Sequence, residues 1–185
     1  MSETSRQNKI FIAVGGRGTG KTTYLKTIAD NHNSKKVLVY DTDDNKKWNY
    51  PYISVEQLAF WKSGKYKLID ANSENVLNEI NNHIKDTFLF IEDATKYINS
   101  SISKSLKNFL LASKQRNVDV IITYHSFRRI PPDLLNFTNG LIIFKTNEDI
   151  REFKSKIPNF ELVSEIYTQV QQHKSRYFYQ VILIN

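Results

Sequence analysis

The sequence has 185 residues, a formal net charge of +7 and no cysteine. This length predicts one folded domain over residues 9–185, preceded by a polar, flexible tail at residues 1–8. The absence of cysteine excludes a disulfide framework and a thiolate zinc site. Apolar runs such as those at 120–122 and 141–144 are far shorter than a membrane span, and the N-terminus is not a signal sequence. We therefore expect a cytoplasmic protein without membrane contact.

The excess of positive charge is spread along the chain, partly in pairs such as Lys46 with Lys47 and Arg128 with Arg129. A nucleic acid is the natural polyanionic partner for such a protein. A solvated basic surface would have the same composition, and charge alone does not separate the two interpretations.

Residues 15–22 match the phosphate-binding pattern G-x-x-x-x-G-K-[ST] at every fixed position. They lie between an apolar run at 10–14, which predicts a buried strand, and residues 22–30, whose apolar spacing predicts a helix. Because glycines tolerate positive φ, successive N–H groups of the turn can converge on a phosphate, together with the helix N-terminus. The residues that we expect to bind the nucleotide are Gly15, Gly16, Arg17, Gly18, Thr19, Gly20, Lys21, Thr22 and Thr23.

Two residues of this motif carry specific roles. We expect Lys21 to be exposed in the loop and to bridge the β- and γ-phosphates, and Thr22 to complete the coordination of Mg²⁺. Arg17 points either into solvent or over the nucleotide, and the sequence favours neither. A glycine-rich turn that binds nothing is the alternative, but the complete match between a strand and a helix favours nucleotide binding.

An apolar run at 37–40 predicts a second buried strand, which ends at Asp41. We expect the aromatic residues of the following connection to form a small satellite core; a stacking surface for bases is the alternative. These residues are Trp48, Tyr50, Tyr52, Phe60 and Trp61. A short strand at 66–69 and a helix at 73–84, with Ser73 as its N-cap, come next.

Residues 87–91 are mostly apolar and are followed directly by Glu92 and Asp93. Such a strand is typical of the middle of a parallel sheet, and ligands of this architecture bind at the carboxyl ends of the strands. This Walker B pattern predicts that one acid lies in the Mg²⁺ shell and that the other accepts a proton from the attacking water. We assign Glu92 to the metal shell and Asp93 as the base; the alternative is a strand that simply ends in exposed acids.

The second half of the chain continues to alternate helices and strands. We expect a helix at 98–113, strands at 118–124, 140–145 and 177–184, and a short helical turn at 130–135. The first of these helices should present Lys104, Lys107 and Lys114 outward, and the strand at 118–124 should end at His125. About seven strands separated mostly by helices predict an α/β fold, with a mostly parallel sheet covered by helices on both faces.

Over residues 9–146, these features resemble the FtsK/HerA superfamily of DNA-pumping ATPases, and within it the small viral genome-packaging ATPases. The resemblance is carried by the P-loop, by the extra strand and helix at 66–84, which suit a RecA-like layout, and by Ile130-Pro131-Pro132. It also rests on Arg116, which lies upstream of a strand that ends in the polar residue His125.

The resemblance implies ATP hydrolysis with Mg²⁺ and movement of DNA, with double-stranded DNA as the expected substrate. It also implies a ring of identical subunits, with a portal or capsid protein as a partner. His125 would sense the γ-phosphate, and Arg116 would act on a neighbouring subunit as an arginine finger.

Departures from the family pattern keep alternatives open. The family usually has Asp-Glu where this chain has Glu92 and Asp93, and His125 replaces the usual Gln and could be structural. Arg116 could instead stabilise a helix C-terminus, with Arg128 and Arg129 as competing fingers. A nucleoside or nucleotide kinase and a nucleotide-gated binding module are the rival functions.

Overall fold

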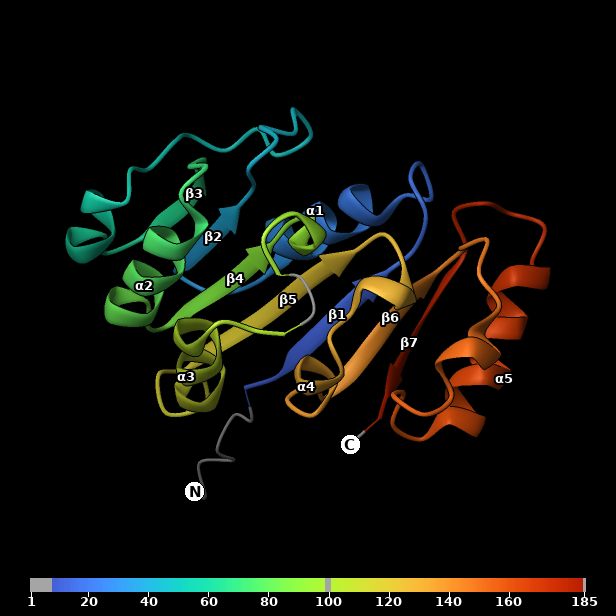
Figure 1. The fold of residues 1–185 in the computed structure, drawn as a ribbon. Helices are drawn as coiled ribbons and strands as arrows, with labels where there is room; N and C mark the ends of the chain where they lie inside the picture. The colour runs from blue at the N-terminus through green and yellow to red at the C-terminus, as the bar shows by residue number, and fades with distance from the viewer. Residues whose placement is uncertain (1–7, 99–100, 185) are drawn as a thin grey trace, which may run out of the picture.

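The computed structural model describes residues 8–98 and 101–184, which fold around one seven-stranded sheet. The strand order is β3-β2-β4-β5-β1-β6-β7, and all neighbours are parallel except β7, which runs antiparallel to β6 (Figure 1). The strands are β1 (Ile10–Val14), β2 (Lys36–Tyr40), β3 (Gly64–Leu68), β4 (Thr87–Ile91), β5 (Val118–Tyr124), β6 (Gly140–Phe144) and β7 (Tyr179–Leu183). The predicted α/β fold with a mostly parallel sheet is confirmed. Most of the predicted N-terminal tail lies outside the described residues.

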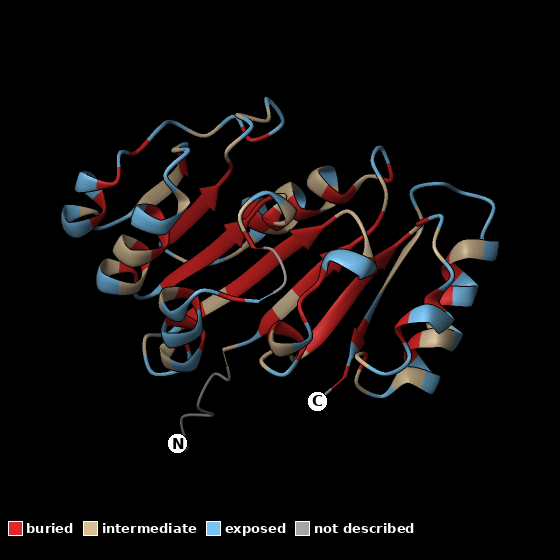
Figure 2. Ribbon diagram, in the orientation of Figure 1, coloured by how far each residue is buried: buried red, intermediate tan, exposed pale blue. Residues whose placement is uncertain are grey.

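Helices cover both faces of the sheet. Those in the described part of the chain are α1 (Lys21–Asn31), α2 (Ser73–His83), α3 (Lys104–Ala112), α4 (Pro132–Leu135) and α5 (Phe160–Gln172), with short 3-10 turns η1 (Glu56–Phe60), η2 (Ala94–Lys96), η3 (Phe127–Arg129) and η4 (Ile150–Phe153). One face packs against α2 to α5, through residues such as Leu77, Leu106 and Val163. The other face packs against α1, through Leu25 and Ala29. The central strands are therefore buried on both sides, which explains their continuous apolar sequences (Figure 2).

In the sheet, β5 lies between the P-loop strand β1 and the Walker B strand β4. β5 pairs with β1 on one side and with β4 on the other. The strand β3 instead lies at the edge of the sheet, outside β2. Along the chain, β3 and α2 separate β2 from β4, as the sequence predicted, but in the sheet β2 and β4 are direct neighbours.

Two helix starts differ from those predicted. The N-cap of α2 is Asn72 rather than Ser73, since the Asn72 side chain accepts a hydrogen bond from the Asn75 N–H. The helix predicted from residue 98 begins only at Lys104, where Ser103 caps it by accepting from the Leu106 N–H at 3.2 Å. Residues 99–100 of that prediction lie outside the described residues. The apolar spacing runs on through the buried Ile98 and Ile102, so periodicity alone placed the start too early.

The aromatic connection after β2 is only partly a satellite core. Trp48 is fully buried and packs against Phe90, with ring centroids 5.3 Å apart. Phe60 and Tyr52, in contrast, are 82% and 59% exposed. The prediction of a satellite core is therefore right for Trp48 and wrong for Phe60.

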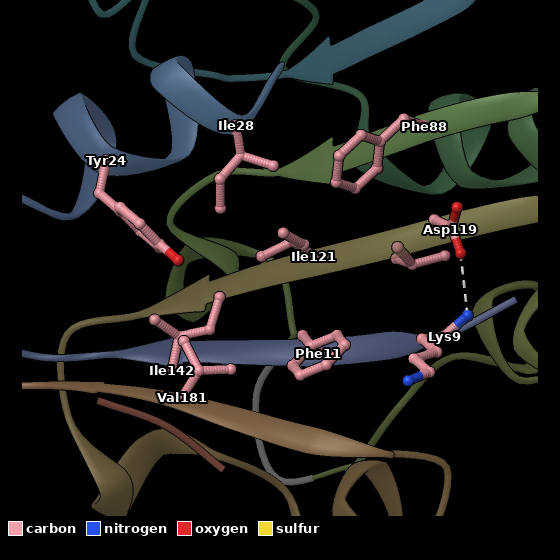
Figure 3. Close-up of a pocket in the computed structure, with 10 residues that line it drawn as sticks. Lys9, Phe11, Tyr24, Ile28, Phe88, Asp119, Ile121, Ile142 and Val181 are labelled. Carbon is pink, nitrogen blue, oxygen red and sulfur yellow. Dashed lines mark hydrogen bonds between the residues drawn. The ribbon is translucent and has the colours of Figure 1, made fainter. Parts of the chain in front are cut away.

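The face of the sheet that packs against α1 also carries an apolar pocket of about 230 Å³ (Figure 3). It extends from Tyr24 of α1, over Phe11 and Ile121, to the amino end of β1. There the Lys9 N–H donates to Asp119 at 2.9 Å.

Among the described residues, the structure contains no helix with the length and apolar character of a membrane span.

Candidate nucleotide site

The P-loop joins β1 to α1 at the carboxyl edge of the sheet. The Gly15 N–H donates to Tyr124 O at 3.1 Å and the Gly16 N–H to Lys145 O at 2.7 Å, which fixes the start of the loop to β5 and to the end of β6. A Cβ at Gly15 would lie 2.5 Å from the Phe144 Cβ, so no side chain fits there.

The loop then takes a conformation that only glycine adopts without strain. Gly18 and Gly20 have φ values of 72° and 92°. Gly20 is the N-cap of α1 and provides no side-chain cap. The first-turn N–H groups of α1 are therefore available to an anion, which is the arrangement that the sequence predicted.

Lys21 is buried, and the expectation that it would be exposed in the loop is wrong. It is the first residue of α1 and only 6% exposed. Its Nζ donates to the carbonyls of Gly15 and Gly16, the latter at 3.0 Å. Burial lowers the pKa of Lys21 to about 8, against the nearby carboxylates of Glu92 and Asp93, which raise it. The side chain is thus folded onto the loop that it would leave in order to reach a phosphate.

Glu92 directly follows β4 and is held in one orientation by two donors. Trp48 Nε1 donates to one carboxylate oxygen at 2.9 Å, and Thr123 Oγ1 donates to the other at 2.8 Å. Burial raises the pKa of Glu92 above its ordinary value, and Asp41 adds to the effect, while the hydrogen bonds from Thr123 and Trp48 oppose it. The alternative of a strand that ends in two exposed acids is therefore wrong, because Glu92 is 6% exposed.

Asp93 is connected to the P-loop lysine through His125. His125 Nε2 lies 3.5 Å from Asp93 Oδ2, and Lys21 Nζ lies 3.2 Å from His125 Nδ1. These contacts suit a histidine that accepts at Nδ1 and carries its proton at Nε2. The hydrogen bond from His125, with a smaller contribution from Thr95, holds the pKa of Asp93 at about 2. The two acids therefore differ: Glu92 is buried between neutral donors, whereas Asp93 is half-buried and paired with a titratable ring.

These groups surround a cavity of about 230 Å³, which we call the acidic cavity. Its walls include the predicted residues Arg17, Gly18, Thr19, Gly20, Lys21, Thr22, Glu92, Asp93 and His125. Arg17 is exposed at its rim. Thr23, also predicted to bind nucleotide, faces a neighbouring pocket instead and accepts a hydrogen bond from Lys47 Nζ at 3.0 Å.

The residues around the acidic cavity suit Mg²⁺ better than a metal held by protein alone. In the described part of the chain, no group of three His, Cys, Asp or Glu side chains could hold a metal ion by itself. Mg²⁺ is usually bound through one or two carboxylates, a hydroxyl, water and substrate phosphates. Thr22, Glu92 and the buried Asp41 line the cavity and offer such a set.

Arg116 is not brought to the acidic cavity. It precedes β5, whose seven residues separate it from His125 and span about 23 Å. Its guanidinium donates to the carbonyl of Asn81, at the amino edge of the sheet. Arg128 and Arg129 follow β5 instead, at the carboxyl edge; Arg128 pairs with Glu152 at 2.6 Å. For Arg129, the described part of the chain shows no ion pair.

Sequence reasoning missed the residues that position the acids. Thr123 accepts a hydrogen bond from the Asp93 N–H at 2.8 Å and donates to Glu92, so one hydroxyl links the two acids. Thr123 lies in the apolar second half of β5, where a polar residue was a usable signal. Trp48 comes from a loop far away along the chain, and its donation to Glu92 had no sequence signature. Asp41 was visible as the acid that ends β2, but its place beside Glu92 follows from the pairing of β2 with β4.

No protein-family model matches the sequence, and no curated protein matches it. Several solved structures, however, have a similar fold. The genome packaging NTPase B204 from Sulfolobus turreted icosahedral virus 2 is similar to this chain in its complexes with sulfate (TM-score 0.77) and with ATP-gammaS (TM-score 0.75). Both are 16% identical and cover 97% of this chain, and 93% and 94% of those chains.

Two further structures share the fold. B204, the DNA-packaging ATPase from Sulfolobus Turreted Icosahedral Virus, has a TM-score of 0.73 at 15% identity, over 97% of this chain and 95% of that chain. The N-terminal domain of zonular occludens toxin from Neisseria meningitidis has a TM-score of 0.55 at 13% identity, over 97% and 96%. The resemblance inferred from the motifs is thus confirmed at the level of the fold, across almost the whole chain.

Proposed function

We propose that this protein is a Mg²⁺-dependent ATPase that uses hydrolysis to move double-stranded DNA, as a viral genome-packaging motor in the host cytoplasm. The observation that carries the proposal is the convergence of Lys21, Glu92, Asp93 and His125 around one cavity beside the P-loop. The fold adds support, because similar structures are described as genome packaging NTPases, one of them with ATP-gammaS bound.

In the proposed reaction, the P-loop N–H groups and Lys21 bind the β- and γ-phosphates. Bound Mg²⁺ would neutralise part of the phosphate charge, next to Thr22 and Glu92. Asp93 and His125 would form the pair that orients the attacking water and takes its proton; this is supported by the contact of His125 with both Asp93 and Lys21. Thr123 and Trp48 hold Glu92 in place through their hydrogen bonds.

A ring of subunits would complete the site. P-loop enzymes commonly use a cation supplied in trans to stabilise the charge that develops in the transition state. Arg129 is the better candidate for this role than Arg116, because it follows β5 at the edge that carries the P-loop. We expect a portal or capsid protein to anchor such a ring.

For DNA, the supporting feature is a row of exposed lysines on α3 and the turn after it. Lys104, Lys107 and Lys114 are all exposed, as predicted from their spacing. Contacts between lysines and phosphates release counterions, so DNA affinity should fall steeply as salt increases.

Phosphate release by the purified protein, with and without linear double-stranded DNA, tests the proposal. We expect ATP hydrolysis that requires Mg²⁺, rises on addition of DNA, and loses this stimulation as salt is raised. Hydrolysis that depends on a small phosphate acceptor instead of DNA would indicate a kinase. Nucleotide binding without turnover under all these conditions would indicate a nucleotide-gated binding module.

A further inference from the structure

A second pocket of about 590 Å³ adjoins the acidic cavity along the P-loop. Gly18, Gly20 and Lys47 line both, so the two hollows meet at the loop that would hold the phosphates. The remaining walls of this second hollow, which we call the aromatic pocket, are mainly rings: Tyr24, Phe144, Tyr177 and Tyr179.

The direction of β7 brings half of these rings to the site. Because β7 runs antiparallel to β6, the segment between α5 and β7 emerges at the same edge of the sheet as the P-loop (Figure 1). Arg176 and Tyr177 belong to this segment and lie directly against the loop. A Cβ at Gly18 would be 2.8 Å from Arg176 Nη2, and one at Gly20 would be 3.3 Å from Tyr177 Cδ1.

The floor of the aromatic pocket is a packed group of three rings. Tyr24 and Tyr179 have centroids 4.0 Å apart, and Phe144 lies 5.3 Å from Tyr179 and 5.9 Å from Tyr24. Tyr177 differs from them because it is 62% exposed. An exposed tyrosine ring held against a glycine of the phosphate loop is a side chain on which a base can stack.

Cations stand at the rim. Lys47 is held next to Thr23, and the Arg176 guanidinium lies 5.7 Å from the centre of the Tyr177 ring. The acidic cavity, in contrast, carries Asp41, Glu92 and Asp93. These charges suit a metal and the reacting γ-phosphate but not an apolar ring. A nucleotide whose phosphates follow the P-loop can therefore place its base favourably only on the aromatic side.

We propose that the aromatic pocket holds the nucleobase and ribose, with the base stacked on Tyr177 and with Arg176 and Lys47 facing the sugar and the α-phosphate. The proposal rests on the function proposed above and adds the base-binding residues. Stacking strength rises with ring area, so purine nucleotides should bind more tightly than pyrimidine nucleotides.

The test compares ligands that share the phosphates but differ in the base. Binding of ATP, CTP and inorganic tripolyphosphate, each with Mg²⁺, is measured by calorimetry for the wild type and for Tyr177→Ala, Tyr177→Phe and the control Phe60→Ala. Phe60 is an exposed ring that lines neither hollow. We expect Tyr177→Ala to weaken ATP binding by about tenfold, to narrow the preference for ATP over CTP, and to leave tripolyphosphate binding unchanged. Tyr177→Phe and Phe60→Ala should resemble the wild type.

Wild-type ATP affinity in Tyr177→Ala would overturn the inference, as would an equal loss of ATP and tripolyphosphate binding, since Tyr177 would then act only through the shape of the P-loop. Either result would leave the proposed ATPase intact. A wild-type protein that binds neither ATP nor tripolyphosphate would overturn both proposals.

Discussion

The acidic cavity and the aromatic pocket share the P-loop but are built in opposite ways. The acidic cavity is made by residues that directly follow parallel strands: Asp41 after β2, Glu92 and Asp93 after β4, and His125 after β5. The aromatic pocket is made by side chains of α1, β6, β7, the β2–η1 connection and the segment before β7. Charge is concentrated on one side of the loop and ring surface on the other.

Under the two proposals, the acidic cavity serves the chemical step and the aromatic pocket serves recognition of the base. Changes to Asp93 and His125 in the acidic cavity should slow turnover while leaving nucleotide affinity largely intact. Changes in the aromatic pocket should weaken binding of the base without touching the reacting phosphate. Loss of a residue that binds the phosphates themselves should abolish both nucleotide binding and turnover.

Lys21 lines the acidic cavity and is expected to bind the β- and γ-phosphates, so its loss should have the largest effect. Lys21→Met keeps the buried aliphatic stem and removes the charge, so the fold should persist while binding of both ATP and tripolyphosphate falls below detection. Calorimetry, together with a thermal melt as control, measures this. A folded variant that hydrolyses ATP at the wild-type rate would refute the phosphate-binding role of the P-loop.

The arginine that completes the site in trans should have the next largest effect. Arginine fingers contribute about 10³–10⁵ in turnover, so Arg129→Ala should retain ATP affinity and lose most hydrolysis. Arg116→Ala should mainly lower the melting temperature, because Arg116 holds the Asn81 carbonyl at the other edge. Mixing Arg129→Ala with Lys21→Met subunits should restore some activity at mixed interfaces. Loss of turnover in Arg116→Ala, with rescue on mixing, would return the role to Arg116.

The two acids should separate into different defects within the acidic cavity. Asp93→Asn removes the partner of His125 and should lower turnover by about 10²–10⁴ while ATP stays bound. Glu92→Gln should instead weaken the binding of ATP that depends on Mg²⁺. Titration of Mg²⁺ against binding and against turnover separates the two outcomes. The reverse pattern would exchange the roles of the acids, and normal hydrolysis in both variants would remove the Walker B assignment.

The smallest expected effect is a dependence of ATP affinity on pH. The pKa of Lys21 is lowered to about 8 by burial, so the free protein loses this charge as the pH rises above that value. Phosphate favours the charged form, so binding above pH 8 should take up a proton, and the affinity should fall by up to about tenfold per pH unit. Calorimetry in buffers of different ionisation enthalpy counts that proton. No proton uptake at pH 9 would contradict the assignment.

Local sequence predicted the acidic cavity far better than the aromatic pocket. The strand at 87–91 and the P-loop are continuous patterns, and the carboxyl ends of parallel strands meet at one edge, so Glu92, Asp93 and His125 converged as expected. The direction of β7 cannot be predicted from the residues of that strand. Arg176 and Tyr177 reach the P-loop only because β7 is antiparallel to β6. Arg116 and His125 lie at opposite ends of β5, as their order along the chain already indicates. The role of Arg116 as a finger on a neighbouring subunit stays a prediction.

If the proposed function is right, ATP hydrolysis at this site moves DNA. The most direct measurement is displacement of a third strand from a triplex placed on linear double-stranded DNA, followed with ATP, without ATP, and with Lys21→Met. We expect displacement that requires ATP and Lys21 and that stops when Asp93→Asn replaces the wild type. Hydrolysis that DNA stimulates without any displacement of the third strand would refute the proposed motor function.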